Sequence, residues 1–491
     1  MSRTQVVTAI IELNAFVDAT ENPSLNDFIS LNFKSFKDHN VSDLSHFRES
    51  IVNAFKQVMA KLKPETEIDP QIDSLLLDEA FYKNKKTPAA IRHILFQWYH
   101  LLSEGHDLDA FFDKHRAEVN SFLHTKTTEP RALMDKMSIK MLQNYGNLSN
   151  KERNILKSCL SYIVDLVDGV DIYKQHIGNK FFWEALDEDS QEEISNEVHE
   201  DISAFCSPII EAMKKDIDTA HVLILEKKIE LIKQKKKHTT EFQTLMAFNY
   251  LIDNEHEWLL NKKFSETELV CHLNDLLKIF FANTNIVTKI GETTASSSKE
   301  SRSINEQNFS KGSSSSFITS GTFFSSTNTS SSERSMSGRK IDLLVTTKQK
   351  VELSCCEFKA SSSSSLTCHQ RSKNLRLNQG VMESLRRMHI DSKVIGLNWE
   401  GKYGYLFALK QVNGLYLGKK IGYVNLPARA DVVNHNFVNT LKLIVAWKGF
   451  LVDLEKKIAE NMMLPPADSS EHLLTCHTPQ YIPNKRQRGS E

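Results

Sequence analysis

The stretch GRKIDLLVTTKQKVELSCCEFK, residues 338–359, constrains the fold more than any other part of the chain. Two runs rich in aliphatic and β-branched residues flank a short polar segment, which predicts an antiparallel hairpin. A two-residue turn at Gln349-Lys350 pairs positions whose numbers add to 699 and sets Asp342 opposite Glu357. Because side chains alternate along a strand, Lys359 shares the face of Glu357. Two carboxylates and one ammonium group therefore converge on one face of the hairpin.

Such a cluster has a specific chemical use. Neighbouring carboxylates repel each other unless a cation lies between them, and Mg²⁺ takes one or two carboxylates together with water and phosphate oxygens. A metal held in this way can lower the pKa of a water molecule and polarise a phosphoryl group. Asp342 and Glu357 are therefore candidate ligands of Mg²⁺ or Mn²⁺, with Lys359 beside the attacking water. The alternative is an ordinary amphipathic hairpin whose charged face is in water.

The pattern of Asp342, a turn and then Glu357-Phe358-Lys359 resembles the D…(D/E)-x-K signature of the PD-(D/E)XK, or restriction-endonuclease-like, nuclease superfamily. The string that continues to RSKNLRLNQGVMESL is also similar to nuclease-like proteins of this superfamily that are numerous in some fungi. The resemblance implies a helix that bears an acid, then a three-stranded meander, then a helix and a further strand. The proline of the signature is absent, since Lys340-Ile341 precedes the aspartate.

This order can be placed on the chain. SETELVCHLNDLLKIFF, residues 265–281, becomes the first helix, and either Glu266 or Glu268 becomes the additional catalytic acid. NIVTKIGET, residues 285–293, becomes the first strand. The helix after the signature bears three cations that we expect to bind nucleic-acid phosphates: Arg371, Lys373 and Arg376.

A serine-rich run separates the first two strands of this meander. Eighteen serines lie between Thr293 and Gly338, with few aliphatic residues. Such a segment cannot bury enough apolar surface to offset its ordering entropy. We therefore expect a disordered insertion at about 293–338 inside a nuclease-like domain of residues 241–462, followed by a flexible basic tail over 463–491.

The rest of the chain completes the expected architecture. Residues 1–240 show helical periodicity, for example in one helix over 150–169, and predict an all-helical region of unknown role that could bind a protein partner. After the basic helix, the runs KVIGLNWEG, YGYLFALKQ, GLYLGKK and IGYVNL predict strands, and residues 431–462 predict a long helix. The expected fold is an α/β (α+β) restriction-endonuclease-like C-terminal domain, with a central mixed sheet flanked by helices, preceded by an all-α N-terminal region.

Two aromatic residues near a predicted strand end could also contact nucleic acid. Trp399 and Tyr403 are candidates for stacking on bases, with a place in the core or at its rim as the alternative.

Charge is unevenly distributed along the chain. The formal net charge is only -1, but residues 339–491 hold 23 Lys and Arg against 13 Asp and Glu, which leaves 38 against 49 for residues 1–338. A basic C-terminal part behind an acidic N-terminal part points to a polyanion partner. The basic clusters at Lys233–Lys237 and in the tail favour the nucleus over the cytoplasm.

Other global features exclude some classes of protein. The seven cysteines are scattered and odd in number, which argues against a disulfide framework. No run approaches the roughly 18 apolar residues that a membrane-spanning helix needs. We therefore expect a soluble intracellular protein with no membrane partner.

These features together predict an Mg²⁺-dependent nuclease that hydrolyses phosphodiester bonds in nucleic acid, with DNA favoured over RNA. The alternative is a catalytically inactive nuclease fold that serves as a nucleic-acid-binding or protein-interaction module. The presence of all three of Asp342, Glu357 and Lys359 favours the enzyme.

Overall fold

The structure is a computed structural model. It divides the chain into two compact units, and the larger one, which spans residues 126–467 with two short additional segments, contains the β-sheet. The expected basic tail over 463–491 lies outside the described residues. The structure describes residues 13, 15–19, 55–62, 88–104, 109–178, 182–183, 199–254, 265–299, 340–360, 364–401, 403–427, 433 and 435–462.

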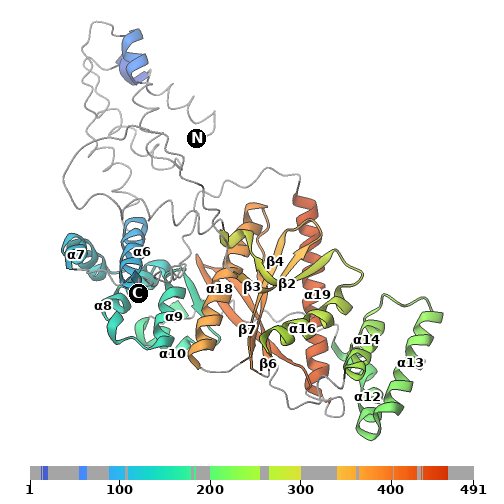
Figure 1. The fold of residues 1–491 in the computed structure, drawn as a ribbon. Helices are drawn as coiled ribbons and strands as arrows, with labels where there is room; N and C mark the ends of the chain where they lie inside the picture. Colours follow the sequence, from blue (N-terminus) through green and yellow to red (C-terminus); the bar gives the residue numbers. More distant parts are fainter. Residues whose placement is uncertain are drawn as a thin grey trace, which may run out of the picture. The chain divides into compact units, whose positions relative to one another are not determined.

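The larger unit is built on a seven-stranded mixed sheet with the strand order β1-β7-β6-β5-β4-β3-β2 (Figure 1). Strands β2, β3 and β4 form one antiparallel meander, and β5, β6 and β7 form another. The two meanders join where β4 and β5 run parallel, and β1 adds to β7 in parallel. The strands are β1 (Ile163–Asp165), β2 (Ile286–Thr294), β3 (Lys340–Thr347), β4 (Glu352–Lys359), β5 (Val394–Glu400), β6 (Tyr403–Val412) and β7 (Leu415–Asn425).

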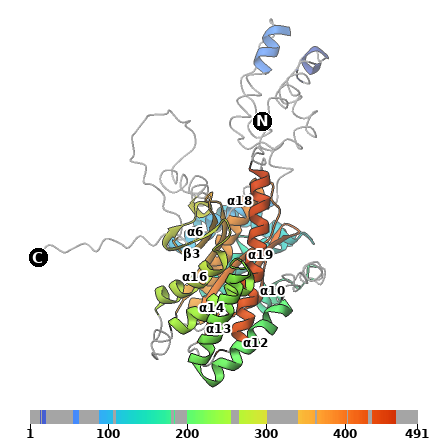
Figure 2. The same cartoon turned by 90° about the vertical axis from the view of Figure 1, so that its right-hand side faces the viewer.

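Helices cover both faces of this sheet. α18 (Ser364–Arg387) connects β4 to β5 on one face, whereas α19 (His435–Asn461) lies on the other face (Figures 1 and 2). α9 packs on α18, where the hydroxyl groups of Ser158 and Ser372 are 3.1 Å apart, and α16 packs on α19 through the rings of Phe281 and Trp447. The other helices are α6 (Pro88–Glu104), α7 (Asp109–His124), α8 (Pro130–Gln143), α9 (Asn150–Cys159), α10 (Val170–His176), α12 (His199–Lys215), α13 (Ile217–Lys233), α14 (Thr240–Asp253) and α16 (Glu266–Phe281).

From α16 to β5 the elements follow the order expected from the sequence: a helix, three antiparallel strands, a helix and a parallel strand. The mixed sheet flanked by helices is thus confirmed. One difference is that GLYLGKK and IGYVNL form the single strand β7, because a bulge at Ile421 lets both halves pair with β6. Among the described residues, none of the helices has both the length and the apolar character to cross a bilayer.

The N-terminal region was expected to be all-helical, but it contains a strand, β1. The helix predicted over 150–169 ends at Cys159 as α9, Tyr162 takes a left-handed backbone φ of 54°, and β1 follows. The backbone of Ile163 and Val164 pairs with the open edge of β7, and both side chains are buried, so burial at the sheet overrides the local helical periodicity. The compact unit that holds the sheet already includes residue 126, so the expected boundary at 241 does not coincide with it.

The first residues of the expected disordered insertion have defined structure. β2 runs to Thr294, and a helical turn follows over 296–299. The buried carboxylate of Glu352 holds this turn, because Oε1 accepts hydrogen bonds from the backbone N–H and the hydroxyl of Ser296, and Oε2 accepts one from the hydroxyl of Ser297. Residues 300–339, the remainder of the insertion, lie outside the described residues.

The β3–β4 hairpin has the expected register but not the expected turn. A three-residue loop, Lys348–Lys350, closes it: Lys350 has a φ of 70°, and the Thr347 N–H donates to the Val351 carbonyl over 2.9 Å. Next to the loop, the residue numbers of paired positions add to 698, as in Thr346 with Glu352. A bulge at Leu353 restores the expected sum of 699 from the pair of Val345 and Ser354 toward the start of β3. Without this bulge the register would slip by one residue, and the two acids would lie on opposite faces.

An amide side chain of α18 fills a gap in the pairing of β4 with β5. The ladder between these strands begins at Cys356, and the side chain of Asn378 binds both the N–H and the carbonyl of Cys355 at 2.9 and 3.0 Å. Gly396 makes this approach possible, because a Cβ there would lie 2.8 Å from Asn378 Nδ2 and 2.5 Å from Phe407 Cζ. Asn378 thus takes the place of one residue of a neighbouring strand.

Replacing Gly396 by alanine should therefore destabilise the fold. We expect Gly396→Ala to lower the free energy of unfolding by about 1–3 kcal/mol, as overpacking in a core does. Gly449→Ala on α19 is the matched control: a Cβ there meets nothing within 4 Å, and alanine in a helix interior should stabilise by about 0.5–1 kcal/mol. Urea unfolding followed by circular dichroism measures both changes. Equal stability of the two variants would contradict the role given to Gly396.

Candidate functional site

The candidate site lies at the end of the sheet where β3 begins and β4 ends. Asp342 is near the start of β3, whereas Glu357 and Lys359 are near the end of β4. The two strands are antiparallel and paired with the sum of 699, so Asp342 faces Glu357 across the hairpin. Glu266, the first residue of α16, reaches the same end of β4. The structure therefore brings together the acids and the lysine of the predicted signature.

Asp342 is a half-buried acid held by the backbone of β4. Its Oδ2 accepts a hydrogen bond of 2.7 Å from the N–H of Phe358. Burial raises the pKa of Asp342, while the hydrogen bond from Phe358 and the nearby charge of Lys373 oppose that rise. A cation placed beside this carboxylate would favour its ionised form.

Glu357 is the most deeply buried acid of the cluster, with 2% of the residue exposed. Its Oε2 accepts a hydrogen bond from Lys373 Nζ at 2.7 Å, but Oε1 has no hydrogen-bond partner among the described residues. Burial raises the pKa of Glu357 to about 7, a rise that Lys373 opposes and Asp342 increases. An unpaired carboxylate oxygen in a buried position is costly, so the site favours either a proton or an additional cation.

Lys359 makes an ion pair with the first helix of the predicted motif. Its Nζ lies 2.6 Å from Glu266 Oε1, and the two side chains are 32% and 38% exposed. The sequence left Glu266 and Glu268 as alternatives for the additional acid. Glu268 instead closes a capping box at the start of α16, where its Oε2 accepts from the N–H of Ser265 over 2.7 Å. Glu266 is thus the acid that meets the signature lysine.

The cations of α18 lie differently from the prediction. Lys373 belongs to the carboxylate cluster, since its Nζ contacts Glu357 and also donates to the carbonyl of Lys340. Arg376 is only 3% exposed, and its Nε donates to the carbonyl of Ser372 over 2.9 Å. The predicted phosphate contact of Arg376 is therefore wrong, because a buried guanidinium does not reach a nucleic-acid backbone.

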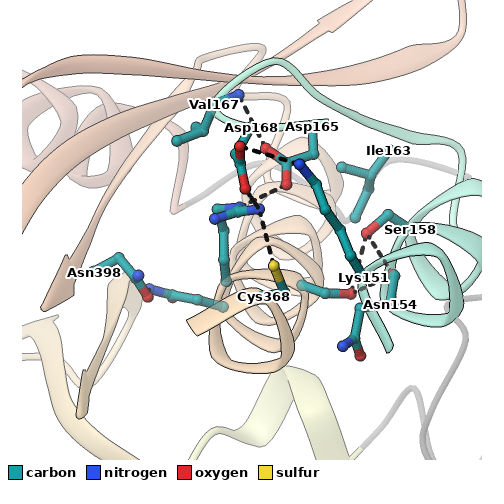
Figure 3. Close-up of polar contacts among 12 residues, drawn as sticks. Lys151, Asn154, Ser158, Ile163, Asp165, Val167, Asp168, Cys368 and Asn398 are labelled. Atoms are coloured by element: carbon teal, nitrogen blue, oxygen red, sulfur yellow. Dashed lines mark hydrogen bonds and ion pairs between the residues drawn. The ribbon is translucent and has the colours of Figure 1, made fainter. Parts of the chain in front are cut away.

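Arg371, the third of these cations, is also buried, with 5% of the residue exposed. Its guanidinium lies 2.7 Å from Asp165 Oδ2 and 3.1 Å from Asp168 Oδ2, two acids at and just beyond the end of β1. Figure 3 shows these acids, with Cys368 and Lys151, around this ion pair. The predicted phosphate contact of Arg371 is wrong for this reason. Its actual partners lie more than 200 residues away in the sequence and in a segment that was expected to be helical.

A neighbouring polar cluster on β5 and β6 was missed by the sequence reasoning. Asn398 Nδ2 and the hydroxyl of Tyr405 both donate to Glu400 Oε1, at 2.7 and 3.3 Å. Glu400 pairs with Lys359 in the parallel ladder, so this cluster adjoins the candidate site, and burial raises the pKa of Glu400. The alternation in NWE, where Asn398 and Glu400 flank a large aromatic residue, was the available signal.

Trp399 occupies the opposite face of β5. It is 1% exposed, and its ring stacks on that of Phe358 with centroids 6.1 Å apart. The alternative of a core position is therefore the correct one for Trp399, and stacking of this side chain on bases is excluded by its burial.

The donor set at the end of β4 suits a hard divalent cation. Across the described part of the chain, no three or more His, Cys, Asp or Glu residues form a group that could hold a metal ion. Asp342 and Glu357 offer two carboxylates, which is the number that Mg²⁺ commonly takes from a protein. The unpartnered Oε1 of Glu357 fits such an ion, and Mn²⁺ accepts the same oxygen ligands.

Comparison with known proteins identified no relative of this chain. The chain matches no protein-family model, no curated protein and no solved structure.

Breaking the buried pair of Arg371 and Asp165 should strongly destabilise the fold. Arg371→Met leaves the carboxylate of Asp165 buried without its cation, and we expect a loss of about 3–5 kcal/mol in the free energy of unfolding. Lys151→Met is the matched control, since it removes an exposed partner of Asp168 and should cost less than about 1 kcal/mol. Chemical unfolding measures both. Similar losses in the two variants would contradict the expected cost of leaving Asp165 buried without its cation.

Stability should also report the titration of Glu357. A carboxyl group whose pKa is raised on folding, here from 4.5 to about 7, stabilises the fold fully below pH 4.5 and loses that contribution as pH rises through 7. We expect Glu357→Gln, which cannot ionise, to gain roughly 3 kcal/mol relative to wild type across this range. Urea unfolding in EDTA at a series of pH values measures the difference, with Glu460→Gln at an exposed position as the control. Parallel stability curves for wild type and Glu357→Gln would contradict the raised pKa.

Proposed function

We propose that this protein is a divalent-metal-dependent nuclease that hydrolyses phosphodiester bonds, with DNA favoured over RNA, on a restriction-endonuclease-like fold. The observation that carries the proposal is the meeting of Asp342, Glu357, Lys359 and Glu266 at one end of the sheet, with one oxygen of Glu357 buried and unpartnered. The order of elements from α16 to β5 supports the same fold.

Asp342 and Glu357 would hold the cation, Mg²⁺ or Mn²⁺. When bound, such an ion lowers the pKa of a water molecule and neutralises charge on the phosphoryl group. A cation beside Glu357 also favours its ionised form, so the raised pKa of this residue does not keep it protonated at neutral pH once the ion is present.

The two lysines have separate tasks in this proposal. Lys359, held by Glu266 at 2.6 Å, directs its ammonium group toward the attacking water and keeps that water in position. Lys373 balances the charge of Glu357 before the cation binds and then becomes available to a phosphate oxygen. Both roles need an ammonium group near the carboxylates, where the substrate phosphate would lie.

The proposed nucleic-acid partner and a nuclear location have weaker support, from charge alone. Residues 339–491 have ten more basic than acidic side chains, 23 against 13. Lys233, Lys235, Lys236 and Lys237 are all exposed at the end of α13 and just after it. Exposed lysines of this kind can bind a polyanion or an import receptor.

One observation favours the second candidate, a nuclease fold that binds nucleic acid or protein without cleaving. The ammonium group of Lys373 already lies 2.7 Å from Glu357, where it provides the positive charge that a metal would otherwise provide. In this reading Lys373 is a permanent partner and the site takes no metal.

A nuclease assay with a second, metal-binding readout separates the two candidates. Purified protein is incubated with plasmid, single-stranded DNA and RNA in Mg²⁺, Mn²⁺ or EDTA. We expect cleavage only with metal, and a loss of about a hundredfold or more in Asp342→Asn, Glu357→Gln and Lys359→Ala. Asp453→Asn, at an exposed position on α19, should cleave as wild type does.

The metal readout is thermal unfolding with and without Mn²⁺. Because a ligand that binds only the folded state stabilises it, Mn²⁺ should raise the melting temperature of wild type but not of Asp342→Asn or Glu357→Gln. Lys373→Met, which removes the competing ammonium group, should be stabilised by Mn²⁺ more than wild type. If metal neither stabilises the protein nor supports cleavage, the proposal of a metal-dependent nuclease is overturned. Retained nucleic-acid binding would then favour the second candidate, a nuclease fold that binds without cleaving.

A further inference from the structure

A surface pocket of about 680 Å³ lies where β6 begins, β7 ends and α19 starts. Its walls come from the two strands and from the first two turns of the helix. The side chains that matter are Tyr403, Tyr423, Asn425, Asn436, Asn439 and Lys442. Among the described residues that line it, none is acidic.

Two exposed tyrosines form one wall of this pocket. Tyr403 and Tyr423 are 44% and 49% exposed, although large aromatic side chains usually bury most of their surface. Their ring centroids are 5.9 Å apart at an interplanar angle of 79°, so the rings meet edge to face. At least one ring face is thus available for a planar ligand, which is the feature that single-stranded nucleic-acid sites share.

Positive charge and amide groups complete the site. The Nζ of Lys420 lies 4.3 Å from the ring centroid of Tyr423 and donates to its hydroxyl over 2.6 Å, which fixes the position of that ring. Lys442 adds an ammonium group from α19 that could pair with a phosphate. Three asparagines supply both donors and acceptors of the kind that bind the edge of a base.

The strand register relates this pocket to the carboxylate site. Lys359 pairs with Glu400, Glu400 pairs with Tyr403, and Tyr403 pairs with Asn425, so these four residues form one row across β4, β5, β6 and β7. Neighbouring strands are about 4.8 Å apart, which places the backbone of Tyr403 roughly 10 Å from that of Lys359. A nucleic-acid strand that crosses the end of the sheet would meet both places.

We infer that this pocket binds an unpaired base and an adjacent phosphate of single-stranded nucleic acid, next to the carboxylate site. A sugar ligand would use the tyrosines and amides but would leave Lys442 without a role, whereas a nucleotide uses all three groups. A duplex keeps its bases stacked on each other and does not offer a free base face to Tyr403. The inference rests on the proposed function for the class of polymer, but it requires no cleavage.

Binding of a short fluorescent oligothymidylate, followed by anisotropy in EDTA, tests the inference without catalysis. We expect Tyr403→Ala and Tyr423→Ala each to bind about 5- to 100-fold more weakly, the range found when one base–aromatic stack is lost. Tyr403→Phe should bind nearly as wild type, because the ring face is retained. Lys442→Gln should reduce the slope of log affinity against log salt concentration by about 0.7, the contribution of one phosphate on a single strand.

Matched controls make the result decisive. Tyr145→Ala changes a tyrosine outside the pocket lining and should bind as wild type does. Asp342→Asn should bind oligothymidylate normally even where it cleaves nothing. Loss of cleavage therefore tests the proposed function, whereas loss of oligothymidylate binding tests this inference. Equal affinity of wild type, Tyr403→Ala and Tyr423→Ala would overturn the inference. Binding of duplex alone, or no binding by wild type, would overturn it as well.

Discussion

The register of the β3–β4 hairpin is the constraint on which the candidate site depends. Asp342 and Glu357 face each other only because the bulge at Leu353 corrects the one-residue offset that the three-residue loop introduces. With the offset uncorrected, Asp342 would turn to the face that holds the stacked rings of Phe358 and Trp399, where its charge would be buried without a partner. Burial of that aromatic face and assembly of the acidic cluster therefore select the same register.

Helix α18 links this cluster to the rest of the sheet. One side chain, Lys373, touches Glu357, while Arg371 binds the acids at and just beyond the end of β1, and Asn378 binds the backbone of β4. Lys373 and Asn378 thus bind β4, whereas Arg371 binds β1 and the residues after it, and these contacts together fix both the rotation and the position of the helix along its axis. The segment that contains β1 is consequently an integral part of the sheet unit, because it provides the carboxylates that Arg371 requires.

The sequence predicted what depends on neighbours along the chain. Strand periodicity predicted β3 to β6, helical periodicity predicted α19, and the order implied by the resemblance placed α16 and β2. The opposition of Asp342 and Glu357 was predicted with a two-residue turn, whereas a three-residue loop and the bulge at Leu353 produce it. The failures involve partners that are distant in sequence: β1 depends on the open edge of β7, and the burial of Arg371 depends on Asp165. A basic helix that contacts phosphates and one that is neutralised by buried acids have the same composition. Only the location of the acids distinguishes them.

The pairing of Thr294 with Lys340 has a consequence for how this protein can vary. The chain leaves β2 and returns to β3 at directly opposed residues, and the turn over 296–299 that follows β2 is held by Glu352. Closing a flexible loop costs only about 0.6 kcal/mol more for each doubling of its length. Insertions after residue 299 should therefore cost the sheet little stability, and the ladder resumes only two residues before Asp342. Evolution, or an engineer, could thus attach a new sequence within reach of the acidic cluster without rebuilding the fold that holds it.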